Sequence, residues 1–502
     1  MSRRVVVVGN GMAGARLVEE LRRRDPQGVH VRPVVLGEEP HAAYNRVLLS
    51  TVLAGGLTAD AVRLQPAGWA AEHGLDVRTG TTVVGIDRGQ QQVECSDGAR
   101  VDYDVLVLAT GSRAWLPPVE GLADAEGLPA DGVVCFRTVA DCEAILAAAR
   151  PGRHVVVLGG GLLGLEAARG VLGRGAEVTV VHPGAVPMDR QLDAGAGAVL
   201  TRVLTGLGVR VRLSARAVSY RSATGARGLV LDDGSFVGAD LVVVAAGVRP
   251  QVELARAAGL ACERAVLVDD ELRTSDRRIR AIGECAEHRG TVHGLVQPAW
   301  EHAAVVADLL TGADPEARYG GSRLVTRLKA HDVDLASMGD VSATTDDPDH
   351  EVVTFSDPTR GRYGKLVLRD ERVVGAVLLG SPEAAAAVTQ LFDRGAPAPV
   401  DRLSLLLGRA VAAEAAQNPV HMPGSAVVCR CNTVTKTQLT TAWRAGAQSS
   451  AALATATRAS TGCGSCRDLV EGICSWLARS EPGVSEPHQP DRTHASRTEG
   501  AA

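Results

Sequence analysis

The chain has 502 residues, enough for three or more domains of ordinary size. Its formal net charge is −5 and it contains no basic block, which argues against a nucleic-acid partner. No apolar run reaches the roughly 20 residues that a membrane helix needs, so we expect no membrane anchor. Ten cysteines without a signal segment indicate a reducing cytoplasm, where thiols bind metals or stay buried.

The first predicted element is a buried parallel strand at 5–8, followed by a glycine-rich turn and a helix at 15–24. A second strand at 31–36 leads to Glu38, a carboxylate that could accept hydrogen bonds from ribose hydroxyls. The turn has the spacing of a dinucleotide-binding fingerprint in the strand–turn–helix context that this motif requires. The fingerprint residues are Gly9, Gly11, Met12, Ala13 and Gly14.

Each glycine of this fingerprint has a separate steric task. Gly9 makes the tight turn, Gly11 lets the backbone approach a pyrophosphate, and Gly14 allows the helix to pack closely on the strand. The helix N-terminus then faces the phosphates. A later strand within 101–112 ends in Ala109, Thr110 and Gly111, and the prolines just beyond it suggest a crossover to another domain.

The same pattern returns 150 residues after Gly9. A strand at 155–158 and a strand at 178–181 enclose a second glycine-rich turn and a helix that runs from Glu166 to Leu172. Two fingerprints in one chain imply two nucleotides that face each other. The second set consists of Gly159, Gly161, Leu162, Leu163 and Gly164.

The chain after the second fingerprint mirrors the chain after the first. A strand at 242–244 is followed by an Ala-Ala-Gly stretch that ends at Gly247, which we interpret as the return crossover. A further strand-to-turn element contains Gly283 and Glu284, and a helix is expected at about 301–311. Beyond it, the pattern predicts strands at 325–328 and 334–338, a hairpin at 365–379 and a helix at 384–392.

Four cysteines near the C-terminus form two close pairs, Cys429 with Cys431 and Cys463 with Cys466. Such pairs on turns can present four thiolates to one metal centre, and either a zinc ion or a [2Fe–2S] cluster fits the ligand count. Helices are predicted at 436–445 and 449–458 between the pairs, and one at 402–416 before them. The polar stretch beyond 479 is expected to be disordered.

Several of these motifs resemble one family of flavoproteins over residues 3–478. The sequence is similar to the reductases with two dinucleotide-binding domains, in particular to nitrite reductase [NAD(P)H] large subunits and assimilatory nitrate reductase electron-transfer subunits. The carrying stretches are 43–50, 109–111, 159–166, 188–193, 283–286 and the cysteine pairs.

The resemblance implies an α/β fold like that of glutathione reductase, with two Rossmann-like domains, a small α+β C-terminal domain and a small helical [2Fe–2S] domain. It implies FAD at the first fingerprint and NAD(P)H at the second, with Arg46 on the FAD phosphates. Glu284 takes the place where many relatives carry an aspartate near the flavin's ribityl and phosphate groups. The expected divisions are 1–113 with 245–315 for FAD, 114–244 for NAD(P)H, 320–395, a linker at 396–425, and 426–478 for the cluster.

The cysteine spacing and its neighbouring residues resemble the bacterioferritin-associated-ferredoxin-like domain. This resemblance implies a [2Fe–2S] cluster held by Cys429, Cys431, Cys463 and Cys466, with structural zinc as the alternative. Disulfide reductases of this architecture use a close cysteine pair beside the flavin. No such spacing precedes Cys429, so a redox disulfide is not expected.

The expected electron path starts at NAD(P)H, passes FAD and leaves through the cluster to a partner protein. Glu166 is the candidate catalytic residue, at the nicotinamide; alternatively its carboxylate only stabilises a helix N-terminus. The resembled nitrite reductases carry sirohaem centres in later domains, so we do not expect this polypeptide to reduce nitrite alone.

The first candidate for the acceptor is a molybdenum nitrate reductase, and the second is a sirohaem nitrite reductase. Alternatives are a reductase for rubredoxin or ferredoxin, and a non-enzymatic redox or iron sensor. The strand at 178–181 ends at His182, which is neither the acidic residue that favours NADH nor an arginine. NADH is favoured by the resemblance alone, and a homodimer is a further expectation.

Overall fold

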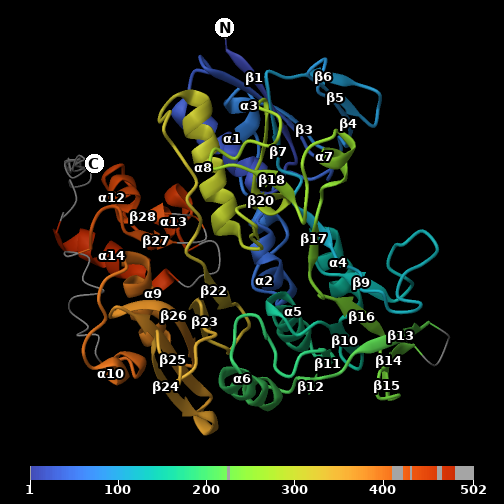
Figure 1. Cartoon of the computed structure of the whole chain (residues 1–502), viewed down its shortest axis with the longest axis vertical. Helices are drawn as coiled ribbons and strands as arrows, with labels where there is room; N and C mark the ends of the chain where they lie inside the picture. The colour runs from blue at the N-terminus through green and yellow to red at the C-terminus, as the bar shows by residue number, and fades with distance from the viewer. Residues whose placement is uncertain are drawn as a thin grey trace, which may run out of the picture. The chain divides into compact units, whose positions relative to one another are not determined.

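The computed structural model describes residues 2–222, 227–409, 422–429, 432, 434–460 and 466–480. The chain forms two compact units, Met1–Ala416 and Gln417–Ala502 (Figure 1). Cys431, Cys463 and the tail beyond 480 lie outside the described residues, and so do residues 410–421 of the expected linker.

The first parallel sheet has the strand order β19-β7-β1-β2-β3. Its central strand β1 is buried on both faces, with Val5 and Val7 in one apolar cluster and Val6 and Val8 in another. Helices α1 and α8 pack against each other over the first of these faces (Figure 1). The bounds are β1 Arg3–Val8, β2 Val31–Leu36, β3 Asp76–Arg78, β7 Val105–Leu108, β19 Ile279–Ala281, α1 Met12–Arg24 and α8 Val296–Thr311.

The second parallel sheet, of order β12-β11-β10-β16-β9, repeats this arrangement. Its central strand β10 lies between β11 and β16, as β1 lies between β2 and β7. The bounds are β9 Val133–Cys135, β10 His154–Leu158, β11 Glu177–Val181, β12 Arg210–Arg212, β16 Leu241–Val244, α4 Val139–Ala148, α5 Leu162–Leu172 and α6 Ala194–Gly206.

Both chain crossings between the two sheets run side by side. Strand β8 (Ser112–Ala114) leaves the first sheet and pairs in antiparallel fashion with β17 (Val248–Pro250), which returns to it. The amide of Trp115 donates to the carbonyl of Gly247 at 2.9 Å. The second sheet is therefore an insertion whose two ends are hydrogen-bonded to each other.

A third sheet, antiparallel and of order β22-β23-β26-β25-β24, follows in the chain. Its central hairpin β25–β26 turns through Asp370 and Glu371, both in the left-handed region at φ +49° and +59°. Helices α9 and α10 cover one face of this sheet. The bounds are β22 Val325–Leu328, β23 Leu335–Gly339, β24 Glu351–Asp357, β25 Arg362–Arg369, β26 Arg372–Leu379, α9 Pro382–Arg394 and α10 Arg402–Leu406.

Smaller elements complete the first unit. Two short antiparallel sheets join β4-β5-β6 and β13-β14-β15, and a short mixed sheet joins β18-β20-β21, in which β18 runs parallel to β20. The bounds are β4 Val83–Asp87, β5 Gln92–Cys95, β6 Arg100–Asp102, β13 Ala217–Arg221, β14 Gly228–Leu231, β15 Phe236–Gly238, β18 Val266–Val268, β20 Ala286–His288, β21 Thr291–Val292, α2 Leu49–Leu53, α3 Trp69–Glu72, α7 Glu253–Ala257, η1 Arg46–Leu48, η2 Asp60–Val62, η3 Gly283–Cys285 and η4 Pro358–Arg360.

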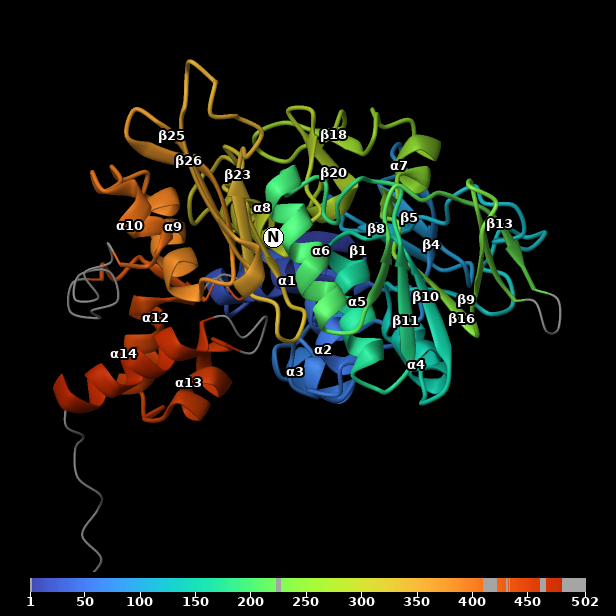
Figure 2. The same ribbon diagram turned by 90° about the horizontal axis from the view of Figure 1, so that it is seen from below.

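One apolar cluster connects all three main sheets. It contains Leu53 from α2, Leu165 from α5 and Leu335 from β23, all buried. Figures 1 and 2 both place α2 beside α5. Because the same core is shared by elements attached to different sheets, this unit packs as one body.

The part of the second unit that the structure describes contains a two-stranded ribbon and three helices. The capping box of Thr435 and Gln438 begins α12, and the Ser449 hydroxyl caps α13. Leu439, Leu453 and Ile473 are fully buried in its core. The bounds are β27 Val427–Cys429, β28 Val434–Thr435, α12 Lys436–Arg444, α13 Ser450–Thr457 and α14 Arg467–Ser480.

The helix predicted at 402–416 is wrong in length, since α10 ends at Leu406. Gly408 follows at φ +72°, a left-handed conformation typical of a helix end. The helices predicted from Ala15 and Glu166 start earlier, at Met12 and Leu162, because the fingerprint glycines Gly11 and Gly161 serve as their N-caps. Within the described residues, every helix is too short or too polar to cross a bilayer.

Candidate functional site: two nucleotide cradles and a thiol centre

The first fingerprint forms a tight cradle at the carboxyl end of β1. Gly9 has φ +114°, and a Cβ atom built on it would lie 2.2 Å from the carbonyl oxygen of Ala109. A Cβ atom on Gly14 would lie 2.0 Å from the carbonyl oxygen of Gly9. Both contacts are too short for any side chain, so the turn requires glycine at both positions.

The second fingerprint has the same geometry at the end of β10. Gly159 has φ +121°, and a Cβ atom on it would lie 2.4 Å from the carbonyl oxygen of Ala245. A Cβ atom on Gly164 would lie 1.9 Å from the carbonyl oxygen of Gly159. The two Ala-x-Gly stretches that mirror each other in the sequence therefore have one steric role, since each packs against a fingerprint turn.

The middle glycine of each fingerprint faces open space. No protein atom lies within 4 Å of a Cβ atom built on Gly11 or on Gly161, although each caps the N-terminus of its helix. Open space at a helix N-terminus lined by backbone amides suits a pyrophosphate. The two cradles thus fit the dinucleotides that the sequence predicts, with Met12, Ala13, Leu162 and Leu163 in the first turns of the helices.

Residues from three distant segments border the first cradle. Gly283, at φ +75°, approaches Ala13, because a Cβ atom on Gly283 would lie 3.0 Å from the Ala13 Cβ. The Glu284 carboxylate accepts a hydrogen bond from the Ser112 hydroxyl and forms an ion pair with Arg137. Thr110 and Gly111 continue from β7 toward the same place, with the Thr110 hydroxyl donating to the carbonyl of Gln251 at 3.1 Å.

The carboxylates after β2 differ in their surroundings. Glu38 is exposed, as a ligand of ribose hydroxyls needs to be. Glu39 is partly buried and forms an ion pair with Arg46, whose guanidinium also lies 5.1 Å from the centre of the Tyr44 ring. Arg46, expected on the FAD phosphates, is thus held by Glu39 near the cradle. Burial is the main cause that raises the pKa of Tyr44, to about 12.

Glu166 is almost fully buried in α5, and its carboxylate lies 3.3 Å from the Lys329 ammonium group. The Lys329 amide donates to the same carboxylate at 3.1 Å, and its ammonium group donates to the carbonyl of Val47. Sequence reasoning missed Lys329. Its one signal is rarity, because the chain has only three lysines, Lys329, Lys365 and Lys436.

His302, in α8, is buried against the turn that contains Gly283. Its Nδ1 accepts a hydrogen bond from the Gly283 amide at 3.2 Å. Burial, with His293 and His288 nearby, lowers the pKa of His302 from 6.5 to about 3. The imidazole is therefore a neutral acceptor that holds this turn in place.

The cysteines of the first unit are poor redox candidates. Burial raises the pKa of Cys135 and of Cys142 to about 11, and it raises the pKa of Cys285 as well. The Cys285 sulfur donates to the carbonyls of Leu108 and Ile282 at 3.4 and 3.3 Å. These thiols stay protonated at neutral pH, and the thiol form is not the nucleophile.

Two of the four expected cluster ligands belong to the described residues. Cys429 and Cys466 are both buried in the core of the second unit. The Asn432 side chain, also buried, donates from Nδ2 to the Cys429 sulfur at 3.7 Å and to the carbonyl of Arg458 at 2.5 Å. A [2Fe–2S] cluster is better served by buried sulfurs that accept an amide hydrogen bond than by sulfurs at a solvated surface.

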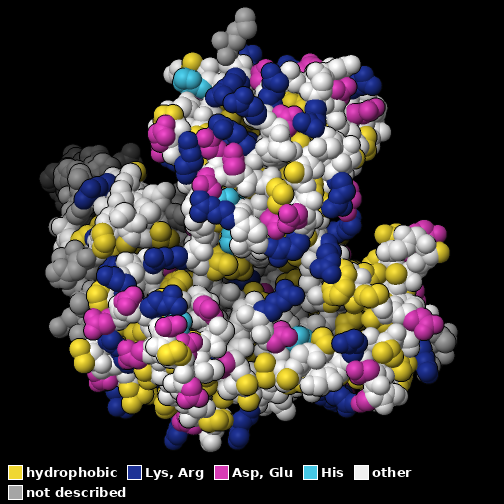
Figure 3. All heavy atoms as spheres, viewed as in Figure 1, with side chains coloured by type: hydrophobic (Ala, Val, Ile, Leu, Met, Phe, Trp, Pro, Cys, Tyr) yellow, Lys and Arg dark blue, Asp and Glu magenta, His cyan; other side chains and the backbone are white. Residues whose placement is uncertain are grey.

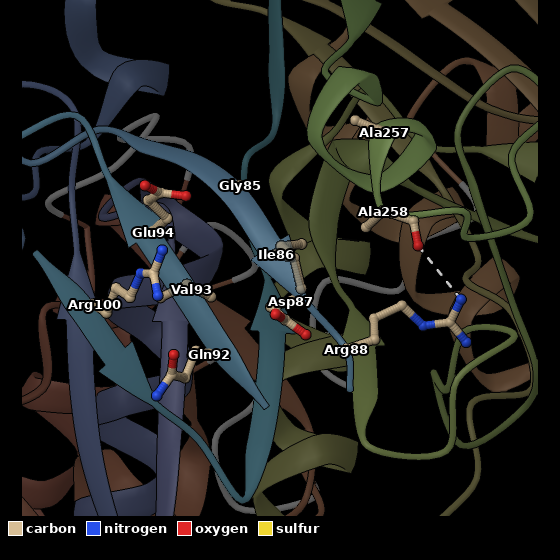
Figure 4. A pocket seen from close by; sticks show the side chains of 10 residues that line it. All are labelled: Gly85, Ile86, Asp87, Arg88, Gln92, Val93, Glu94, Arg100, Ala257 and Ala258. Atoms are coloured by element: carbon tan, nitrogen blue, oxygen red, sulfur yellow. Dashed lines mark hydrogen bonds between the residues drawn. The ribbon is translucent and has the colours of Figure 1, made fainter. Parts of the chain in front are cut away.

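A surface pocket between β4, β5 and the end of α7 is unrelated to these sites (Figure 4). The guanidinium of Arg88 closes one side and donates to the carbonyl of Ala258 at 3.4 Å. None of its lining residues belongs to either cradle. Acidic and basic side chains are interspersed over most of the face shown in Figure 3.

Comparison with protein families divides the chain into three matched segments. Residues 3–304 match the pyridine nucleotide-disulphide oxidoreductase family, and residues 325–396 match the rubredoxin NAD+ reductase C-terminal domain. Residues 427–475 match the BFD-like [2Fe-2S] binding domain. The third match includes Cys429, Cys431, Cys463 and Cys466.

Two relatives illustrate the range of similar proteins. The assimilatory nitrate reductase electron transfer subunit of Bacillus subtilis (strain 168) is 36% identical, over 95% of this chain and 60% of that protein. The rubredoxin-NAD(+) reductase of Alcanivorax borkumensis is 36% identical, over 63% of this chain and 81% of that protein. This chain spans less than two thirds of the first relative's length.

Solved structures share the fold of the first unit. A ferredoxin reductase from Rhodopseudomonas palustris has a TM-score of 0.69 and 26% identity, over 82% of this chain and all of that chain. An NAD-dependent persulfide reductase from A. fulgidus has a TM-score of 0.72 and 26% identity, over 82% and 83%. Together the matches confirm the predicted α/β fold with a [2Fe–2S] domain and the cofactors FAD, NAD(P)H and [2Fe–2S].

Proposed function

Since the chain belongs to the pyridine nucleotide-disulphide oxidoreductase family, we propose that it passes electrons from NADH to a molybdenum nitrate reductase. The observation that carries this proposal is the combination of two glycine cradles in one unit with buried cluster thiols in the other. A sirohaem nitrite reductase is the second candidate acceptor. This chain spans 60% and 58% of the lengths of the two relatives whose names suggest these acceptors.

Each cofactor is proposed to bind to a different part of the chain. Residues 1–113 with 245–315 would hold FAD, 114–244 would hold NAD(P)H, and 426–478 would hold the cluster. When bound, FAD takes two electrons as a hydride from NAD(P)H and a [2Fe–2S] cluster carries them one at a time to the acceptor, with release of one proton.

The chain's own residues bind and orient these groups. Gly9, Gly11 and Gly14 would place backbone amides on the FAD pyrophosphate, and Glu38 would accept hydrogen bonds from its ribose. Arg46 and Glu284 would border the phosphate and ribityl groups, each fixed by an ion pair to Glu39 or Arg137. Each pair keeps a charged group oriented before the cofactor binds.

The second cradle would receive the nicotinamide dinucleotide in the same way. Gly159, Gly161 and Gly164 would bind the pyrophosphate, while Gly247 would let the chain turn away beside it. Glu166 would act as the catalytic-site carboxylate at the nicotinamide, positioned by Lys329. We assign no disulfide step to the first unit, because burial raises the pKa of its Cys135 and Cys285 thiols.

The test is an anaerobic titration of the purified full chain with NADH. We expect the flavin absorbance to bleach first and the electron paramagnetic resonance signal of a reduced [2Fe–2S] cluster to follow. The variant C429S should keep flavin bleaching and lose nitrate reduction in a mixture with the partner enzyme. A wild-type protein that contains one zinc and no cluster, or that leaves the nitrate reductase oxidised, would refute the proposal.

A second candidate function is reduction of rubredoxin or a ferredoxin. The match of residues 325–396 to the rubredoxin NAD+ reductase C-terminal domain favours it. In this case rubredoxin would be reduced as fast by C429S as by the wild type, since its electrons would leave from the flavin directly. A cytoplasmic location and a homodimer complete the proposal, and light scattering of the purified protein tests the latter.

A further inference from the structure

The segment that follows β11 folds back over the second cradle. The Nδ1 atom of His182 accepts a hydrogen bond from the Gly160 amide at 3.2 Å. The Met188 amide donates to the Gly160 carbonyl at 2.9 Å, with Met188 itself in the left-handed region at φ +52°. Both backbone polar groups of Gly160 are therefore bonded to this segment, which fixes it against the fingerprint.

This fold brings Asp189 back to the end of β11. One carboxylate oxygen of Asp189 lies 3.7 Å from the Nε2 atom of His182. Both side chains enclose Gly184, since a Cβ atom on Gly184 would lie 2.7 Å from the other Asp189 oxygen and 2.7 Å from His182 Nε2. The Asp189 side chain is 48% exposed, whereas that of His182 is 10% exposed. The pair thus presents a carboxylate to solvent and keeps the imidazole behind it.

The place is the one where dinucleotide folds distinguish their two substrates. A side chain just beyond the second strand reads the adenosine ribose; a carboxylate binds the hydroxyls of NADH, and an arginine binds the 2′-phosphate of NADPH. His182 holds this place in the chain but is turned onto Gly160. Burial lowers the pKa of His182, so the ring offers no positive charge to a phosphate at neutral pH.

The cations that could favour NADPH at this place are Arg212 and Arg190. Arg212, on the neighbouring strand β12, donates to the Ser235 hydroxyl at 3.2 Å and lies 3.6 Å from the Asp233 carboxylate. It is therefore directed toward the turn that precedes β15. Arg190 is exposed and follows Asp189 directly in the chain. If Arg190 instead of Asp189 faced the ribose, the site would favour NADPH.

We propose that Asp189, which lies beside His182 and Gly184, is the residue that selects NADH over NADPH in the second cradle. Its carboxylate accepts hydrogen bonds from the ribose hydroxyls and repels a 2′-phosphate. His182 is a positioning residue, because it acts through Asp189 and through Gly160. This inference rests on the proposed function, which places the nicotinamide dinucleotide at Gly159–Gly164.

The test compares the flavin-loaded wild type with D189N, R190Q and the control E143Q, which changes an exposed carboxylate on α4. Stopped-flow flavin reduction should show a wild type that prefers NADH. D189N should lose roughly tenfold or more in kcat/KM for NADH, because a charged hydrogen-bond acceptor is removed, and should gain with NADPH. R190Q and E143Q should keep the wild-type preference.

A binding measurement separates this inference from the proposed function. The fragments 5′-AMP and 2′,5′-ADP differ only in the 2′-phosphate, and their dissociation constants report on the ribose site without hydride transfer. We expect the wild type to bind 5′-AMP more tightly and D189N to lose this discrimination. If neither NADH nor NADPH reduces the flavin, the proposed function fails, while the fragment ratio still decides the role of Asp189. A wild type that prefers 2′,5′-ADP, or an unchanged ratio in D189N, would overturn the inference.

Discussion

The ammonium group of Lys329 lies 3.3 Å from the carboxylate of Glu166, and both side chains are largely buried. Lys329 follows β22 of the third sheet, Glu166 belongs to α5 of the second, and the carbonyl of Val47 that Lys329 also contacts precedes α2. One lysine thus joins three segments around the two cradles. A buried charge that loses its partner is costly, whereas loss of the whole pair is often tolerated.

Substituting Lys329 by methionine should therefore destabilise the protein and slow flavin reduction. Leaving Glu166 buried without its partner should cost about 3–5 kcal/mol in the free energy of unfolding. The double variant K329M/E166Q should recover much of this stability, since no charge stays buried, but not the rate of flavin reduction by NADH. Denaturant unfolding and stopped-flow absorbance measure the two effects. Equal stability of the single and double variants would contradict this explanation.

The two cradles should respond to glycine substitutions independently. G9A should yield protein without FAD, because its Cβ atom would collide with the carbonyl of Ala109 at 2.2 Å. G159A should keep FAD and lose reduction by NADH, for the same reason at Ala245. G11A is the matched control: it meets no protein atom within 4 Å, so it should fold normally and only weaken FAD binding. The flavin content of each variant and the bleaching of its flavin by NADH measure the two effects. Loss of FAD in G159A would show that the two cradles do not respond independently.

The amide of Asn432 should tune the potential of the cluster. It donates to the sulfur of Cys429, and hydrogen bonds to ligand sulfurs raise the reduction potentials of iron–sulfur clusters. N432A should therefore lower the midpoint potential by tens of millivolts, where about 59 mV is a tenfold change for one electron. A redox titration followed by electron paramagnetic resonance measures it, with Q448A, at an exposed position, as the control. An unchanged potential at full cluster content would exclude this role.

Protonation of His302 should contribute to acid destabilisation. The unfolded histidine binds a proton below about pH 6.5, but the folded one does so only near pH 3, so stability is complete above 6.5 and falls as the pH decreases between these values. The slope for one proton is about 1.4 kcal/mol per pH unit. H302N should flatten the pH dependence of the unfolding free energy by up to this amount between about pH 5 and 6.5. The control is H41N, at an exposed position, and an equal slope in H302N and wild type would refute the assignment.

The fingerprints could be predicted because their requirement is local. Gly9 and Gly14 are fixed by contacts within one turn and with the strand end beside it, and these leave a pattern in the sequence. The pair of Lys329 and Glu166 leaves no such pattern, since 163 residues separate its members. Asp189 was missed because the sequence pattern points to the residue directly after β11, which is His182. The chain returns to this place only seven residues later, at Asp189.

Helix α6 was missed for a different reason. Its sequence contains Gly195, Gly197 and Gly206, and each glycine costs about 1 kcal/mol relative to alanine in a helix. Packing reverses this preference, because a Cβ atom on Gly195 would lie 2.8 Å from the Tyr363 ring and one on Gly197 would lie 2.3 Å from Val186. Gly195 and Gly197 let α6 approach its neighbours, a benefit that only the tertiary structure reveals.

The apolar cluster shared by α2, α5 and β23 limits how this protein can be divided. The second sheet enters and leaves through the hydrogen-bonded ribbon β8–β17, so by connectivity it could be excised and the ribbon ends rejoined. Removing it would, however, expose Leu49 and Leu53 of α2 and Tyr363 of β25, which stay behind. The insertion is therefore separable as a piece of chain but not as a piece of folded protein. Truncation studies of the flavoprotein part should keep residues 2–409 together and place their cuts only beyond them.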